Sequence, residues 1–175
     1  LGDSLALTCP AGEERSVVLR YRAFSGDSGG EGRILRFTLD RKPPDPPRPK
    51  DPPSTYYDIP AILTLLPGAG GTEVFASVSA DGAASPFLPV AGQLDLPGSD
   101  AGAVSYIVRA YAVDAAGNRS MEMKSIGIVV DRSSVYVAED GGDKGDGSPD
   151  RPYRSLDLAL ASALRAGKKS VNLRG

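Results

Sequence analysis

An internal repeat constrains the fold of this 175-residue chain more than any other feature of its sequence. When the sequence is shifted against itself by 87 positions, so that Leu7 meets Leu94, similar residues coincide without a gap. The other matched pairs are Pro10 with Pro97, Val17 with Val104, Arg22-Ala23 with Arg109-Ala110, Phe24 with Tyr111, Asp27 with Asp114, and Gly30 with Gly117. After a four-residue length difference, Leu39-Asp40-Arg41 matches Val130-Asp131-Arg132. A repeat of this length suits one small β-sandwich per copy, a fold of roughly 100 residues.

Both copies contain the side-chain alternation of a β-strand ahead of a turn rich in Asp and Gly. In the second copy this strand spans 103–113, and its predicted core face is Tyr106, Val108, Ala110 and Ala112. The corresponding core face of the first copy is Leu19, Tyr21, Ala23 and Ser25. Further strands are predicted at 59–66, 74–79, 93–96 and 126–130 in the second copy, and at 4–9, 16–25 and 33–40 in the first.

The stretch GDSGG at residues 26–30 has the sequence that surrounds the nucleophile in trypsin-like serine proteases. A serine hydroxyl needs a positioned base to take its proton, and in that arrangement the base is a histidine. The chain contains no histidine, and the repeat aligns Ser28 with Ala115. A Ser–Lys pair is the remaining alternative, but the trypsin motif is no evidence for it. We therefore predict a turn over 27–30, in which Asp27 accepts backbone N–H bonds, and no catalytic residue.

The composition excludes several classes of site. Cys9 is the one cysteine, so the chain forms no internal disulfide, and without histidine it lacks the usual ligands of a zinc site. We predict Cys9 as a small buried apolar residue. The net charge of −2 gives no basic excess for binding nucleic acid. No apolar run reaches the roughly 18 residues that a membrane helix needs.

Oxygen-ligated calcium is the one metal that the composition leaves open. Acidic residues gather in a glycine-rich segment near the C-terminus, beside Glu139, and the candidate ligands are Asp140, Asp143, Asp146 and Asp150. Their spacing does not match an EF-hand, which places acids at alternate positions and ends on a glutamate. A solvated glycine-rich turn is the alternative, and we expect no cofactor.

Between the two copies runs the segment RKPPDPPRPKDPP, in which proline recurs too often for a helix or a central strand. We predict a stiff, extended linker in polyproline II form. A ligand for a proline-reading domain is the alternative, because PxxP patterns occur.

The second copy also carries a family resemblance, in YIVRAYAVDAAGNRS followed by VVDR. The matching positions are Tyr106, Val108, Ala110, Ala112, Asp114, Gly117, Asn118 and Ser120. They resemble the bacterial immunoglobulin-like modules of the chitobiase/β-hexosaminidase C-terminal type, although the family's glycine-rich, tyrosine-bearing hairpin is here VFASVSADG. The resemblance implies a spacer of a secreted or surface protein, with no catalytic residues. Asn118-Arg119-Ser120 is also a glycosylation sequon, but we favour a turn role for Asn118.

From residue 133 the pattern changes to a strand, a glycine-rich loop, a helix and a strand near Val171. The helix is predicted over about 153–166, with Pro152 at its start, Gly167 at its end, and an apolar stripe of Leu156, Leu160, Ala163 and Leu164 with Ala159 beside it. The residues that carry a second resemblance are Tyr136-Val137, Asp146-Gly147-Ser148-Pro149, Pro152-Tyr153, Ser155-Leu156, Ala159-Leu160, Ala163 and Gly167. They resemble the N-terminal entry of right-handed parallel β-helix proteins, the pectate-lyase-like group. This implies a helix that caps a solenoid, whose coils would carry any catalytic residues.

Together these features predict a mainly β chain of immunoglobulin-like β-sandwich repeats, followed by the strand–loop–helix–strand start of a truncated parallel β-helix. The expected parts are 1–42, the C-terminal part of an incomplete repeat; 43–53, the proline-rich linker; 54–131, a complete repeat; and 132–175, the cap and first strand of the β-helix. We expect the missing half of the first repeat to lie upstream.

The functional expectation is a non-catalytic spacer of a large bacterial surface or secreted protein, placed extracellularly, on the cell surface or in the periplasm. Its expected partners are adjacent domains and a glycan or host surface, with a role in adhesion. The alternative is an accessory region of a polysaccharide lyase or glycosidase, whose active site would lie in downstream coils.

Overall fold

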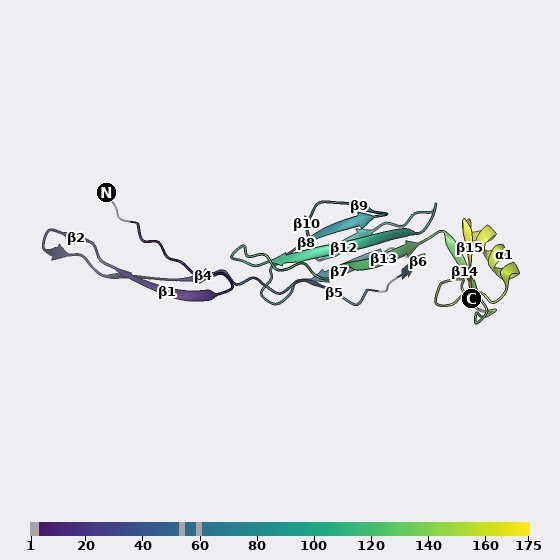
Figure 1. The fold of residues 1–175 in the computed structure, drawn as a ribbon, viewed down its shortest axis with the longest axis horizontal. Coiled ribbons are helices and arrows are strands. Elements are labelled where there is room, and N and C mark those ends of the chain that lie inside the picture. The colour runs from purple at the N-terminus through teal and green to yellow at the C-terminus, as the bar shows by residue number, and fades with distance from the viewer. Residues whose placement is uncertain (1–3, 53–54, 59–60) are drawn as a thin grey trace.

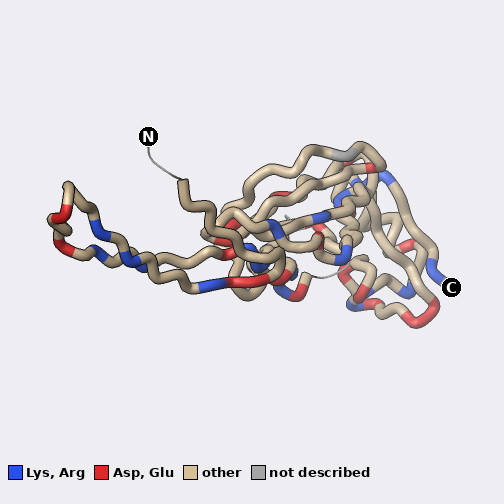
Figure 2. The backbone as a smooth tube through the Cα atoms, turned by 60° about the vertical axis from the view of Figure 1, so that its left-hand side comes forward, with Lys and Arg blue, Asp and Glu red and all other residues tan. Residues whose placement is uncertain are grey.

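The computed structural model describes residues 4–52, 55–58 and 61–175. The chain is mainly β, with several separate sheets and one short helix among these residues (Figure 1). A hairpin, a central two-sheet unit and a C-terminal unit follow one another along an elongated molecule. Basic and acidic residues are interspersed along all three (Figure 2). In the part of the chain that is described, no helix is long and apolar enough to span a membrane.

The hairpin pairs β1 (Glu14–Tyr21) antiparallel with β4 (Arg33–Asp40). At its tip, β2 (Phe24–Ser25) pairs with β3 (Ser28–Gly29). The tip turns at Gly26, whose φ of 60° lies in the left-handed region that glycine adopts without strain. The predicted strand at 33–40 is confirmed, whereas the predicted turn over 27–30 is wrong by two residues. Because Ser28 pairs with Ser25 across the tip, the turn centres on Gly26 and Asp27.

The central unit consists of two antiparallel-rich sheets. The larger has the strand order β10-β8-β12-β13-β6, with β9 also on β8. Its strands are β6 (Thr55–Tyr57), β8 (Glu73–Ala80), β9 (Ala83–Ala84), β10 (Leu88–Val90), β12 (Val104–Val113) and β13 (Ile126–Asp131). The smaller sheet has the order β11-β7-β5, with β5 (Arg48–Pro49), β7 (Ala61–Leu66) and β11 (Gln93–Leu96).

The core lies between these two sheets. Leu63 and Leu65 of β7 belong to the same buried cluster as Val108 of β12 and Val130 of β13, and all four are at most 1% exposed. The predicted core face of the second copy is confirmed, since Tyr106, Val108, Ala110 and Ala112 are all buried. The strand predicted at 59–66 is observed as β7, with 59–60 outside the described residues.

The first copy does not form a corresponding core. Tyr21, Ala23 and Ser25 are exposed and Leu19 is half-buried, so the predicted core face is wrong. Residues 4–9 form no strand, although Cys9 is buried as predicted. The repeat supplies the reason: residues 4–9 correspond to β11, which pairs with β7, and the described part of the first copy contains no counterpart of β7.

The proline-rich segment is packed onto the central unit rather than extended away from it. Pro44 and Pro47 are buried, and Arg48 of β5 lies opposite Leu66 at the edge of the smaller sheet. Proline is tolerated at such an edge because it has no partner strand on its outer side. Within the predicted linker 43–53, residues 48 and 49 therefore form a short edge strand paired with β7.

The C-terminal unit pairs β14 (Ser134–Ala138) in parallel with β15 (Ser170–Arg174), and α1 (Leu156–Ala166) connects them. The predicted strand near Val171 is confirmed. The helix begins later than predicted because Ser155 is its N-cap, and it ends as predicted at Gly167, which is left-handed. Pro152 is buried ahead of the helix and not in its first turn.

The helix packs through its small residues. Ala159 and Ala163 are buried against Val135 and Val137 of β14. Of the predicted apolar stripe, Ala163 and the neighbouring Ala159 are thus buried, whereas Leu156, Leu160 and Leu164 are exposed, with Leu164 84% accessible. An alanine face lets the helix backbone approach the two-stranded sheet, and this leaves the leucines on the outer side.

Candidate functional site: the junction of the central and C-terminal units

A buried carboxylate lies where β13 leaves the central unit. Asp131 has no accessible surface. Its Oδ1 accepts hydrogen bonds from the backbone N–H groups of Ser133 and Ser134, both at 3.0 Å, and from the Ser133 hydroxyl at 3.2 Å. Its Oδ2 accepts from the Tyr136 hydroxyl at 2.7 Å. Four donors on the first residues of the C-terminal unit are thus held by the last residue of the central unit.

These contacts set the protonation state of Asp131. Burial by itself would raise the pKa of this carboxyl, but the hydrogen bonds from Tyr136, Ser134 and Ser133 outweigh it and hold the pKa below its usual value. Burial and the hydrogen bond to Asp131 in turn raise the pKa of the Tyr136 hydroxyl. At neutral pH the site therefore holds a carboxylate that accepts from a neutral tyrosine.

A second set of contacts crosses the junction from Lys168, just after α1. Its ammonium pairs with Asp58 and donates to the carbonyl of Arg132 at 2.9 Å. It also lies 5.3 Å from the ring centre of Tyr57, close enough for a cation–π contact. The Lys168 side chain is only 9% exposed, so these contacts are poorly screened by water.

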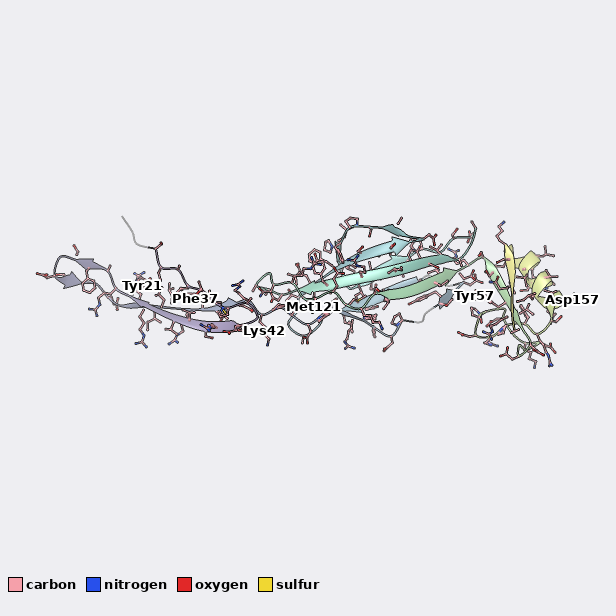
Figure 3. All side chains as sticks on the ribbon, in the orientation of Figure 1. Tyr21, Phe37, Lys42, Tyr57, Met121 and Asp157 are labelled. Carbon is pink, nitrogen blue, oxygen red and sulfur yellow. The ribbon has the colours of Figure 1, made fainter. Side chains whose placement is uncertain are left out.

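Tyr57 closes the junction at the end of β6 (Figure 3). Its hydroxyl donates to the carbonyl of Ser134 at 2.8 Å, and its ring meets that of Tyr136 edge-on at 6.1 Å. Burial and then the nearby charges of Asp58 and Asp131 raise the pKa of Tyr57, so it stays a neutral donor. We call Tyr57, Asp58, Asp131, Tyr136 and Lys168 the junction cluster.

Backbone hydrogen bonds also join the ends of β6 and β13 and the residues after α1. The N–H of Asp58 donates to the Asp131 carbonyl at 3.1 Å, and the N–H of Lys169 donates to the Ser133 carbonyl at 2.7 Å. No buried side-chain nitrogen or oxygen among the described residues lacks a hydrogen-bond partner. The polar groups of the junction cluster bond to one another and to neighbouring backbone groups, so the cluster stabilises the contact between the two units.

Asp131→Asn tests the protonation state that the geometry implies. A carboxyl whose folded pKa is lowered stabilises the fold above its unfolded pKa of roughly 3.9, and this stabilisation is lost as the pH falls through the folded pKa. The free energy of unfolding of the wild type should therefore exceed that of Asp131→Asn at about pH 6, and the difference should shrink towards about pH 2. Urea denaturation across this range measures it. A difference that stays constant or grows on acidification would show that Asp131 is not a carboxylate at neutral pH.

The predicted calcium ligands lie in the loop between β14 and α1. Asp146 accepts from the N–H of Ser148 at 3.0 Å and pairs with Arg151 at 3.3 Å. Hydrogen bonds from the side chain and the N–H of Ser148, together with the charge of Arg151, lower the pKa of Asp146. Asp140 lies 3.6 Å from Arg174, and Asp143 and Asp150 are exposed. Within residues 4–52, 55–58 and 61–175, no group of three or more acidic, cysteine or histidine side chains is placed to hold a metal ion. Calcium binding therefore stays a prediction without a preformed site.

A smaller contact joins the central unit to the hairpin. The Asn118 side-chain amide donates to Asp114 Oδ2 at 2.9 Å and to the backbone carbonyl of Asp40 at 3.2 Å. Asp114 Oδ1 accepts from the N–H groups of Ala116 and Asn118. The predicted turn role of Asn118 is confirmed, and the same amide fixes the end of β4.

An arginine–aromatic cluster, which the sequence analysis did not identify, covers part of the outer face of the larger sheet. Its members are Phe75, Phe87, Arg109, Tyr111, Arg119 and Glu122. Tyr111 lies opposite Phe75 across β12 and β8, and their rings stack at 5.2 Å. The Arg119 guanidinium lies 3.6 Å from the Tyr111 ring centre, and Glu122 pairs with Arg119 at 3.1 Å. The cluster holds the segment after β12 against the sheet.

The sequence signal for the junction cluster was incomplete. The repeat aligns Asp131 with Asp40, which marks a shared strand end but not burial. Lys168 and Asp58 are 110 positions apart, and no sequence pattern relates them.

No protein-family model matches the sequence, and a search of curated proteins finds no relative.

Proposed function

We propose that this chain is a non-catalytic spacer that fixes the orientation of a following domain, in a large bacterial surface or secreted protein located extracellularly or in the periplasm. In this proposal the hairpin and central unit are immunoglobulin-like repeats of the chitobiase/β-hexosaminidase C-terminal type. The C-terminal unit is the capped entry of a parallel β-helix. The pattern of residues given above supports both assignments, and the mainly β structure is consistent with them.

The observation that carries the proposal is the junction cluster. A flexible linker between domains would leave its polar groups in water, and relative motion of the domains would then be expected. Here the buried Asp131 and Lys168 instead join the last strand of one unit to the first strand and the helix of the next. The cost of ordering these side chains is useful only if the two units must keep one orientation.

A spin-label distance measurement tests this rigidity. Labels at Ile107→Cys on β12 and Leu164→Cys on α1 occupy exposed positions, in a Cys9→Ala background. We expect a narrow distance distribution for the otherwise wild-type chain. Lys168→Ala should broaden it, because the ion pair with Asp58 and the bond to the Arg132 carbonyl are lost.

Lys169→Ala is the matched control, since Lys169 is adjacent and exposed. It should leave the distribution unchanged. A broad distribution already present before the Lys168 substitution would contradict the spacer proposal.

A further inference from the structure

The hairpin has an apolar face over which no second sheet lies among the described residues. In β1 the side chains of Val17, Leu19 and Tyr21 share one face, and the pairing register puts Phe37, Leu35 and Arg33 opposite them. We define the open face as Val17, Leu19, Tyr21, Leu35, Phe37 and Leu39. Leu35 is 50% and Tyr21 44% exposed, and the other four are half-buried. Tyr21 and Phe37 lie on the hairpin, away from the central unit (Figure 3).

The internal repeat identifies the counterpart of this face. With the shift of 87 positions, Leu19 and Tyr21 correspond to Tyr106 and Val108; after the four-residue length difference, Leu39 corresponds to Val130. The hairpin pairs Val17 with Phe37, whereas β12 and β13 pair Val104 with Val130. The two registers thus differ by two residues. A shift of two leaves every side chain on its original face, so the open face corresponds to the core face of β12 and β13.

In the central unit a second sheet covers this core face, and a further strand pairs with the edge of β12. Ala61, Leu63 and Leu65 of β7, all at most 2% exposed, pack over it from the smaller sheet. The edge of β12 that faces away from β13 pairs antiparallel with β8, from Tyr106 opposite Ala80 to Val113 opposite Glu73. In the hairpin β1 pairs only with β4. The described residues therefore contain no counterpart of β7 over the open face and no counterpart of β8 along the edge of β1.

The tip of the hairpin differs from the equivalent part of β12. Phe24–Ser25 corresponds to Tyr111–Ala112, which in β12 continue straight alongside β8. In the hairpin these two residues turn back and pair with Ser28–Gly29.

We propose that the open face and the β1 edge form the acceptor half of a second β-sandwich. The occupant is a polypeptide segment that contributes two strands of the kinds seen in β7 and β8. One would lie over the open face with apolar side chains at alternate positions, and the other would pair antiparallel with β1. This is strand addition together with core completion, and it does not depend on the spacer function.

The strands of the central unit fit this acceptor in size. Leu19 and Tyr21 present a leucine and a tyrosine where β12 has Tyr106 and Val108, so the larger side chain changes place. Cores tolerate such exchanges when total volume and pattern are kept. The chain itself therefore contains a template for the occupant.

The test places a second copy of residues 43–90 directly ahead of Ser4 in the otherwise intact chain, in line with the repeat alignment. Hydrogen exchange then reports on the amides of residues 19–25. We expect these amides to exchange at least about 100-fold more slowly than in the unmodified chain, because they enter a cooperative unit.

Two adjacent residues provide a disruptive variant and its matched control. Leu35 lies on the open face and Ile34 on the opposite one, and they are similarly exposed, at 50% and 53%. Within the extended chain, Leu35→Asp should abolish the protection and Ile34→Asp should retain it. An extended chain in which residues 19–25 exchange as fast as before, or in which both substitutions act alike, overturns the proposal.

The unmodified chain supplies a second, independent measurement. Sedimentation should show a monomer, and Leu35→Asp should leave the thermal midpoint of the central unit unchanged. A dimer that Leu35→Asp converts to a monomer would mean that a second copy of the chain covers the open face, and the strand-donor proposal would then be wrong.

Discussion

Asp131→Ala should destabilise the chain by about 3–4 kcal/mol at neutral pH, because it leaves several buried donors without an acceptor, each worth ~1–3 kcal/mol. The donors are the N–H groups of Ser133 and Ser134 and the hydroxyls of Ser133 and Tyr136. Water cannot replace the carboxylate without rearrangement, since Asp131 has no accessible surface. Urea denaturation followed by circular dichroism measures the loss.

The repeat provides the control for this substitution. Asp40 occupies the equivalent strand end, and its Oδ1 accepts a single bond, from the N–H of Lys42 at 2.9 Å. Because Asp40 is half-exposed and water can replace its carboxylate, Asp40→Ala should cost no more than a weak capping contact, about 1 kcal/mol or less. Equal losses for the two variants would contradict the structural role assigned to Asp131.

A comparison of the two aspartates also shows how far the sequence could predict the site. The alignment of Leu39-Asp40-Arg41 with Val130-Asp131-Arg132 locates both strand ends. It does not distinguish a buried carboxylate from a half-exposed one, because burial here depends on residues that arrive from elsewhere. Tyr57 and Lys168 enclose the Asp131 junction from β6 and from the end of α1. These contacts join residues that are far apart in the sequence, so local sequence patterns do not predict them.

The fold was more predictable where a strand had its partners within the chain. The alternation around Tyr106 and Val108 identified the core face of β12, and Gly167 identified the end of α1. The periodicity of α1 identified its apolar side, but it does not say which residues of that side another element covers. Ala159 and Ala163 are buried, since their small size permits close approach to β14, whereas Leu164 stays outside.

The sharpest contrast between the two copies is at one aligned pair of alanines. Ala110 has no accessible surface and lies in the core between the sheets, opposite Ala76 of β8. Ala23, its equivalent, is exposed. The sequence predicted both as core, because the alternation is the same, but only β12 has β7 above it.

Ala110→Leu should therefore lower the stability of the central unit by about 1–3 kcal/mol, because the added carbons must displace packed neighbours. For a unit of this size the thermal midpoint should fall by roughly 4–8 °C per kcal/mol. Ala23→Leu should change stability by less than about 0.5 kcal/mol, since its side chain extends into solvent. Thermal unfolding of the two variants beside the wild type provides the measurement. A loss at Ala23 as large as that at Ala110 would mean that a layer already covers the hairpin in this chain, and the open face would not exist.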